Sequence, residues 1–198
     1  VGLPISYTIT VNPIPIVAAV PDETVCSNTA TTAVTFTSTT AGTTFSWTND
    51  NTSISMPASG SGNIPSFTAT NTGASAITAT ITVTPTANGC VGLPISYTIT
   101  VNPIPIVDPI PDETVCHNDV TSAVTFTSAT AGATFAWTNN NTSIGLGASG
   151  NGNVASFTAT NTGTSAITAT ITVTPIANGC VGLPISYTIT VNPIPIVA

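Results

Sequence analysis

The stretch VGLPISYTITVNPIPIV occupies residues 91–107, and identical copies stand at residues 1–17 and 181–197. Polar and apolar residues alternate along its middle, so that Ile95 and Tyr97 fall on one face of an extended chain while serine and threonine fall on the other. Alternation with a period of two is typical of a half-buried β-strand. The stretch therefore predicts a strand that ends in the proline-rich segment NPIPIV.

The three copies begin 90 residues apart, which indicates a repeat of that length. We expect two complete domains, at residues 19–108 and 109–198, because this period suits an array of small independent domains. Residues 1–18 are then the last strand and linker of a repeat whose body is missing. Either the chain is a window on a longer array, or this strand completes a domain in another molecule. The last repeat has its own final strand and leaves no vacant groove, which favours the window.

The composition excludes several classes of function. Only 4% of the residues are charged, and the chain has no lysine or arginine. Without cations to neutralise phosphates, binding to nucleic acid or to an anionic membrane surface is not expected. The chain has no run of about 18 apolar residues, so we do not expect this segment to insert into a membrane. Apolar residues make up 41% of the chain and fall in strand-like patterns, which argues against disorder.

Each repeat shows about seven strand-like segments and no helical pattern, as an immunoglobulin-like domain would. In the first repeat the segments lie near residue 25, at 33–38, at 44–48, near 54, at 65–70, at 76–84 and at 94–102. Glycine- and asparagine-containing turns separate them. Phe45 and Trp47 share the inward phase of the third segment, as do Phe135 and Trp137 in the second repeat. The sequence thus predicts an all-β sandwich with these four aromatic residues in its core.

The four cysteines, Cys26, Cys90, Cys116 and Cys180, allow three pairings. Because successive strands reverse direction, we expect the first strand to start at the end of the domain where the loop between the last two strands lies. That arrangement places Cys26 beside Cys90 and Cys116 beside Cys180, and it favours a disulfide within each repeat. Pairing Cys90 with Cys116 would instead cross-link adjacent repeats. Disulfides indicate an oxidising, extracellular setting, and the lack of a CxxC motif argues against zinc.

Other polar residues carry weaker signals. His117 is the only histidine and is replaced by serine in the first repeat, so we expect it to be solvent-exposed and not catalytic. We also favour a core role for the tryptophans over a sugar-stacking one. The acids near the repeat junctions are expected to be solvated, with calcium as the alternative, because calcium needs six to eight oxygen ligands. These acids are Asp22, Glu23, Asp108, Asp112 and Glu113. Three asparagines in N-x-S/T patterns indicate exposed loops: Asn51, Asn140 and Asn141.

The order of motifs resembles that of a known family. From TVC and AVTFT through TTFSWTNDNTSI and GSGNIPSFTATNTG to ITATITVTPTANGC and PISYTITVNPIP, it resembles the PKD-like, immunoglobulin-like repeats of giant surface proteins in the Bacteroidota. The resemblance covers the whole chain and implies tandem β-sandwiches in a long extracellular adhesin, similar to gliding-motility adhesins exported by type IX secretion. It implies no catalytic residues. The WxFGDG motif of the PKD domain is replaced by WTND or WTNN, a departure from the family pattern.

The linker suggests a mechanical role. Pro103 and Pro105 are expected to hold it extended and semi-rigid, so that the domains follow one another head to tail. We therefore predict a structural, non-catalytic segment of an extracellular fibre or cell-surface adhesin stalk. The alternative is a carbohydrate- or surface-binding module that acts through the Gly/Ser-rich loops at 55–65 and 145–155. The expected partners are neighbouring repeats of the same fibre and laterally packed copies of it; no cofactor or metal is expected.

Overall fold

The computed structural model describes residues 2–195, and its contacts divide the chain into two compact units. Unit 1 comprises Val1–Asn71 and Ile77–Val101, and unit 2 comprises Thr72–Ala76 and Asn102–Ala198. The proline-rich linker at residues 102–108 therefore belongs to the unit that follows it, as does the equivalent linker at residues 12–18. We refer to these two segments as the linkers of unit 2 and unit 1.

Both units are built from the same seven elements, six β-strands and one short 3₁₀ helix. Those of the first repeat are β1 (Glu23–Cys26), β2 (Thr44–Asn49), η1 (Thr52–Ile54), β3 (Ser59–Ser61), β4 (Ile77–Ala87), β5 (Cys90–Val91) and β6 (Ile95–Asn102). Those of the second are β7 (Glu113–Cys116), β8 (Thr134–Asn139), η2 (Thr142–Ile144), β9 (Ser149–Asn151), β10 (Ile167–Ala177), β11 (Cys180–Val181) and β12 (Ile185–Asn192).

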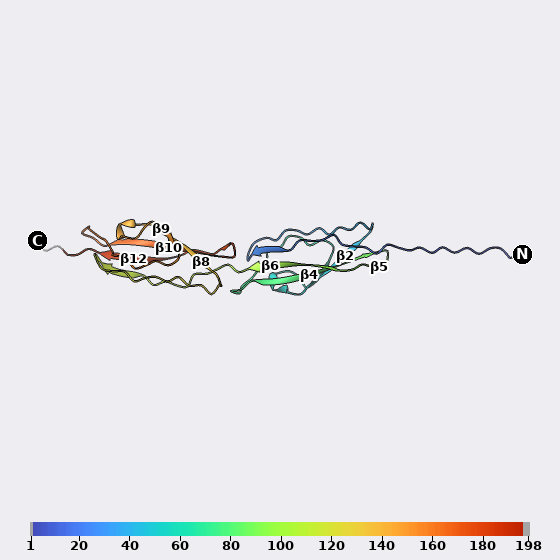
Figure 1. The fold of residues 1–198 in the computed structure, drawn as a ribbon, viewed down its shortest axis with the longest axis horizontal. Helices are drawn as coiled ribbons and strands as arrows, with labels where there is room; N and C mark the ends of the chain where they lie inside the picture. The colour runs from blue at the N-terminus through green and yellow to red at the C-terminus, as the bar shows by residue number, and fades with distance from the viewer. Residues whose placement is uncertain (1, 196–198) are drawn as a thin grey trace. The chain divides into compact units, whose positions relative to one another are not determined.

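One six-stranded sheet dominates each repeat. Its order is β1-β6-β4-β2-β3 in the first repeat and β7-β12-β10-β8-β9 in the second, with β5 paired to β4 and β11 paired to β10. Figure 1 shows β4 running beside β6. The pairing of β10 with β8 and with β12 is antiparallel, but β7 runs parallel to β12. This parallel pairing decides where the cysteines lie.

The alternation of threonine with apolar residues creates the two faces of the sheet. On the inner face, Ile81 lies opposite Tyr97, and both side chains are almost fully buried. On the outer face, the Thr78 and Thr100 hydroxyls are hydrogen-bonded to each other at 3.0 Å across the same two strands. β-Branched residues favour strands, and cross-strand hydroxyl pairs stabilise them without any charge. The outer face is consequently polar although the chain carries almost no charge.

The layer that covers this sheet is less regular than the sequence predicts. The segments predicted as strands at 33–38 and 65–70 contribute only isolated bridges, Val34 with Ile64 and Ala30 with Thr68. The segment near residue 54 is the 3₁₀ helix η1 and not a strand; the Asn51 side chain caps it by accepting from the Ser53 N–H. Side chains replace the missing ladder, as where Asn63 Oδ1 accepts from the Phe36 N–H at 3.0 Å.

Between the sheet and this covering layer lies a hydrophobic core in each unit. In unit 1, Ile54, Ala79, Ile81, Val83 and Val101 are wholly buried, and in unit 2 their equivalents occupy the same role. Phe36 packs against Phe45 with ring centroids 5.6 Å apart, and Phe126 and Phe135 are 5.7 Å apart. Each unit is therefore an all-β, immunoglobulin-like sandwich with its own core.

Candidate functional site

The most elaborate feature repeated in both units is the place where the linker binds. It is built on the hairpin between β4 and β5, and its equivalent between β10 and β11. Asn88 and Gly89 form the turn with φ values of 49° and 78°, and Asn178 and Gly179 repeat them at 50° and 79°. Two successive positive φ angles define the tight turn that Asn-Gly sequences favour between antiparallel strands. The reversal expected from the NGC motif is present in both units.

The linker of unit 1 lies on this hairpin through one side-chain hydrogen bond and one close approach of its backbone. The Asn12 side-chain amide donates to the Asn88 carbonyl at 3.2 Å. The Pro15 carbonyl lies so close to Gly92 that a Cβ atom built on that glycine would be 1.9 Å from its oxygen. Gly92 is required here because any side chain would occupy the position of the linker backbone.

Unit 2 repeats the arrangement. The Asn102 amide donates to the Asn178 carbonyl at 3.3 Å, and a Cβ atom on Gly182 would lie 2.0 Å from the Pro105 carbonyl oxygen. Pro103 and Pro105, the predicted linker residues, are both buried. Of the two, Pro105 contributes its carbonyl to the contact with Gly182, and the stiffening expected of both stays a prediction.

Apolar anchors complete the binding of the linker. Val17 is 8% exposed and Val107 is 3% exposed, and each is part of the hydrophobic core of its unit. The next residue in each case donates its backbone N–H to the covering layer, from Ala18 to Thr37 at 3.0 Å and from residue 108 to residue 127 at 2.9 Å. The linker therefore enters each unit along a fixed path.

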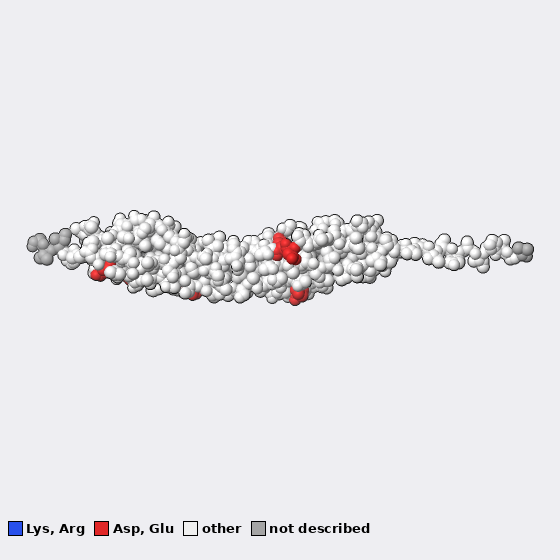
Figure 2. Space-filling model, viewed as in Figure 1, with Lys and Arg blue, Asp and Glu red and all other residues white. Residues whose placement is uncertain are grey.

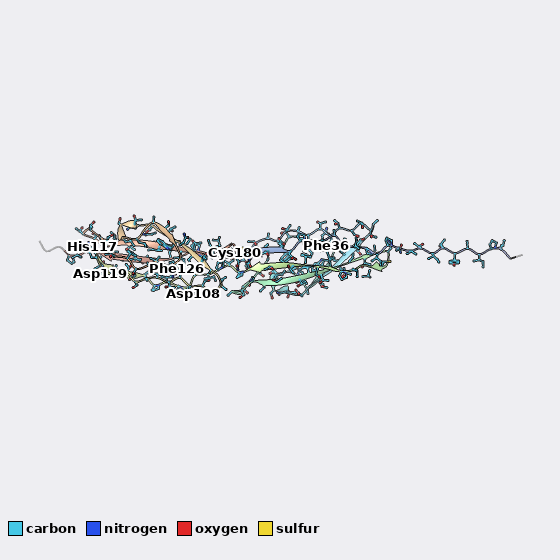
Figure 3. All side chains as sticks on the ribbon, viewed as in Figure 1. Phe36, Asp108, His117, Asp119, Phe126 and Cys180 are labelled. Atoms are coloured by element: carbon cyan, nitrogen blue, oxygen red, sulfur yellow. The ribbon has the colours of Figure 1, made fainter. Side chains whose placement is uncertain are left out.

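The structure corrects the predicted disulfides. In unit 2, Cys116 is paired in register with Asn192 at the last residue of β12, whereas Cys180 lies in β11, before β12 begins. Eight residues of strand at about 3.3 Å each separate these two positions, so they lie at opposite ends of the unit. Figure 3 shows the same separation between His117, the neighbour of Cys116, and Cys180.

The bonding state of the cysteines agrees with this geometry. Cys90 and Cys116 are free thiols, while Cys26 and Cys180 are disulfide-bonded. Because each repeat contains one of the thiols, the predicted bonds from Cys26 to Cys90 and from Cys116 to Cys180 are wrong, and so is the alternative bond from Cys90 to Cys116. The error came from the first strand: its parallel pairing carries its terminal cysteine away from the hairpin.

A small acidic cavity lies beside the first strand of each repeat, about 310 Å³ in unit 1 and about 300 Å³ in unit 2. Tyr97 and Tyr187 reach these cavities, and within the described residues their hydroxyls have no hydrogen-bond partner. Burial, together with the nearby carboxylate of Glu23 or Glu113, raises the pKa of each tyrosine to about 12. The phenols therefore stay neutral at physiological pH.

The acids of this cavity are used by the fold. Asp22 accepts from the Thr98 N–H at 2.7 Å, and this backbone hydrogen bond holds the pKa of Asp22 below its usual value. Glu23 accepts from the Thr32 N–H at 2.7 Å. Within residues 2–195, no group of three or more His, Cys, Asp or Glu side chains could hold a metal ion. The junction acids thus have local structural partners, which the sequence prediction of solvated acids did not include. Calcium at the junctions stays a prediction that nothing here tests.

His117 is half-buried and hydrogen-bonded, not solvent-exposed as predicted. Its Nδ1 accepts from the Asn161 N–H at 2.9 Å. In the first repeat, the Ser27 hydroxyl accepts from the Asn71 N–H at 2.8 Å in the same way. The two side chains therefore have the same role: each accepts a hydrogen bond from a loop N–H, that of Asn161 or Asn71, next to the first strand.

The tryptophans lie in the core, as the sequence predicts. Trp47 and Trp137 are each 8% exposed, and Phe45 and Phe135 pack partly buried against the same clusters. Gly60 in β3 makes room for the indole, because a Cβ atom there would be 2.2 Å from Trp47 Cζ2. The segments at 55–65 and 145–155, predicted as Gly/Ser-rich loops, thus contain strands β3 and β9.

Figure 2 shows a few acidic side chains on an otherwise uncharged face, and the chain has no lysine or arginine. In the part of the chain that the structure describes, no helix has the length and hydropathy needed to cross a membrane.

Sequence reasoning missed the linker site. Its key residues are the asparagines that begin the linkers and the glycines that follow the hairpins, Asn12, Asn102, Gly92 and Gly182. All four lie inside the stretch that occurs three times. The identity of its non-strand residues across copies was the available signal, because strand periodicity alone does not require an invariant Gly or Asn.

Comparison with known proteins places this geometry in a family. The PKD-like domain family matches residues 23–105 and 113–195. No curated protein sequence matches the chain. Among solved structures, the two immunoglobulin domains of DIP-gamma align with 92% of this chain and 99% of their own length, at 9% identity and a TM-score of 0.50.

Two further solved structures are similar over about half of their own length. Domains EC1–4 of Drosophila N-cadherin align at 12% identity and a TM-score of 0.46, covering 93% of this chain and 50% of that one. Sidekick-1 immunoglobulin domains 1–4 align at 11% identity and a TM-score of 0.47, covering 90% of this chain and 48% of that one. The DIP-gamma match supports the immunoglobulin-like fold and nothing beyond it.

Proposed function

Because this chain belongs to the PKD-like domain family, we propose that it is a structural, non-catalytic segment of an extracellular fibre, in which each repeat acts as a spacer. The observation that carries the proposal is the linker site. Both linkers are held by a hairpin, a glycine contact and a buried valine within the unit that follows them. A linker anchored in this way has little slack, and a chain of such units transmits tension without first extending a loose connection.

The surface supports a role outside the cell. The outer face of the sheet presents threonine hydroxyls, which carry no charge at physiological pH. The chain has no lysine or arginine, so it offers no site to proteases that cleave after these residues. Disulfide-bonded Cys26 and Cys180 fit an oxidising compartment. We further propose that the fibre is the stalk of a bacterial cell-surface adhesin. Its main partners are then neighbouring repeats, and the threonine faces are its surface for lateral packing.

The proposal is tested by measuring how the contour length of the chain grows with the number of repeats. Chains with two, four and eight repeats are imaged by electron microscopy, and the contour length of each is measured. The expected increment is about 30–40 Å per repeat, on the basis of strands of about nine residues at 3.3 Å each. An increment that shrinks as repeats are added would show that the chain folds back on itself, and this outcome would overturn the spacer role.

A further inference from the structure

The acidic cavity beside the first strand of each repeat holds much of the charge of this chain. In unit 2 it is lined by residues 109–113, by residues 122–125 of the covering layer and by Tyr187 of β12. The residues 90 positions earlier line the cavity of unit 1. Each cavity has one aspartate and one glutamate, so the two cavities contain four of the seven acids in a chain without lysine or arginine. No basic side chain of this protein can neutralise them.

Backbone N–H groups hold the carboxylates of the cavity in place. Glu113 Oε1 accepts from the Ser122 N–H at 2.7 Å, and Asp112 Oδ1 accepts from the Thr188 N–H at 2.6 Å. Each of these bonds uses one of the two carboxylate oxygens. The second oxygen of Glu113, Oε2, is buried and has no hydrogen-bond partner among the described residues. Because a buried acceptor without a donor is costly, this oxygen fits a donor that another molecule brings.

The tyrosine of each cavity is a second polar group without a partner. Tyr187 is 2% exposed and Tyr97 is 3% exposed, and within residues 2–195 the buried hydroxyl of each has no hydrogen-bond partner. Buried tyrosine hydroxyls usually have one. A neutral phenol oxygen accepts a hydrogen bond, as a carboxylate oxygen does. In unit 2, Tyr187 and Glu113 therefore provide two acceptors at one cavity, and the protein supplies no donor to either.

We propose that each cavity binds a primary alkylammonium group. An ammonium has three N–H donors for these acceptors, and its positive charge complements the two carboxylates. Its alkyl stem would lie along the apolar part of the wall, which in unit 2 includes Pro111, Ala123 and Val124. A cavity of about 300 Å³ is at the small end of the range for ligand sites, so it suits one such group.

The source of the ammonium lies outside this chain, because the chain has no lysine. It is either a lysine side chain of a partner protein or a free amine. Two other ligand classes fit less well. A sugar hydroxyl could donate to either oxygen but would leave the carboxylate charge unpaired. A calcium ion takes six to eight oxygen ligands, more than the two carboxylates of one cavity provide. The site goes beyond the spacer function and does not depend on it.

The first test is an NMR titration of the isotope-labelled 198-residue chain at constant ionic strength. The probe is n-butylammonium chloride, and 1-butanol is its neutral analogue. The Thr32 and Ser122 amides report on the two cavities separately, because they donate to the glutamates of units 1 and 2 and differ in residue type. We expect saturable shifts of both amides with butylammonium and none with butanol. Equal shifts with the two probes, or no saturable shift with butylammonium, would overturn the proposal.

Two variants of unit 2 separate binding from folding. Glu113→Gln keeps an oxygen that can accept from the Ser122 N–H but removes the charge, so it should weaken butylammonium binding at Ser122 about tenfold. Tyr187→Phe removes a hydroxyl that has no partner among the described residues, so it should weaken binding about fivefold without lowering the Tm of unit 2. Thr32 should respond as before in both variants. Unchanged affinity at Ser122 in both would overturn the proposal.

The matched control is Asp50→Asn, which removes one acid that does not line either cavity. Asp50 accepts from the Thr80 N–H, and in the second repeat Asn140 accepts from the Thr170 N–H at the equivalent position, so the substitution keeps this hydrogen bond. The control lowers the net charge by the same amount as Glu113→Gln and should leave binding unchanged. An equal loss of affinity in the control would assign the effect to net charge and overturn the site.

A short peptide with one central lysine between two glycines, blocked at both ends, distinguishes the two sources of the ammonium. If it binds at least as tightly as butylammonium, the cavity takes a lysine side chain of a partner protein. If butylammonium binds and the peptide does not, the cavity takes free amines; both results support the alkylammonium site. The contour-length measurement of the spacer function is made without amines, so failure of this proposal is distinguishable from failure of that function.

Discussion

The contact between Gly182 and the linker offers the sharpest test of the linker site. An alanine Cβ at this position would lie 2.0 Å from the Pro105 carbonyl oxygen and 2.6 Å from Pro175 Cγ. Ordinary van der Waals contact begins near 3.4 Å, so the linker backbone must move by more than 1 Å. Gly182→Ala therefore either strains the site or displaces the linker.

Both routes have a cost that can be bounded. Strain from overpacking a well-packed site costs about 1–3 kcal/mol. Displacing the linker exposes Val107, which costs about 1.5–3 kcal/mol, and breaks the Asn102 hydrogen bond, which costs about 1 kcal/mol. The chain takes the less costly route, so we expect a loss of about 2 kcal/mol in the free energy of unfolding of unit 2. For a domain of this size that corresponds to a fall in Tm of about 8–16 °C.

The assay is differential scanning calorimetry of the two-repeat chain with its cysteines kept reduced. Unit 1 keeps Gly92 and serves as an internal reference, so Gly182→Ala should separate a second, lower transition from the first. The control is Gly147→Ala in the same unit, because a Cβ atom there meets nothing within 4 Å. If Gly182→Ala melted like the unsubstituted chain, or if Gly147→Ala lost as much, the linker contact would not be a stabilising part of the fold.

Three further predictions concern side chains inside the units. Gly60→Ala should displace the Trp47 indole, shift the tryptophan fluorescence to longer wavelength and lower the free energy of unfolding by about 1–3 kcal/mol, and unchanged fluorescence would contradict this. His117→Ala should cost about 1–3 kcal/mol in urea unfolding because it leaves a loop N–H without its acceptor, whereas His117→Ser should restore most of the loss; equal losses would show that the acceptor is not what matters. Asp22 has a folded-state pKa below its usual 3.8. Its contribution to the free energy of unfolding is therefore fully present above pH 3.8 and is lost as the pH falls through the lowered pKa. Asp22→Asn should therefore make urea midpoints less sensitive to pH below 5, and an unchanged acid profile would rule out the hydrogen bond to Thr98 as the cause.

The main sheet could be predicted from the sequence because its strands alternate strictly. The segments predicted at 44–48, 76–84 and 94–102 are strands β2, β4 and β6, whose ends differ from the prediction by at most three residues. Strand β3 was missed because its sequence, SGS, is typical of a loop. Gly60 has no side chain because the Trp47 indole fills the space where one would lie. The periodicity of the sequence does not reveal a contact of this kind.

The cysteine pairing could not be predicted because it depends on the direction of one short strand. The first strand of each repeat has only four residues. So short an alternation does not show whether the strand pairs antiparallel with the next strand in the chain or parallel with the last one. The observed pairing with β12 is parallel, and it moves Cys116 to the end of the unit away from the hairpin. The linker site was missed for a related reason, since Gly182 is explained only by a backbone carbonyl that lies 77 positions earlier in the chain, at Pro105.

The central claim is that these repeats are spacers of an extracellular fibre, and its most direct test is made on the cells that produce the protein. Intact, unpermeabilised cells are labelled with an antibody raised against the 198-residue chain and examined by immunogold electron microscopy. The account predicts gold particles along extended surface filaments, spaced in multiples of a constant interval. Label that appears only after the cells are permeabilised would contradict it.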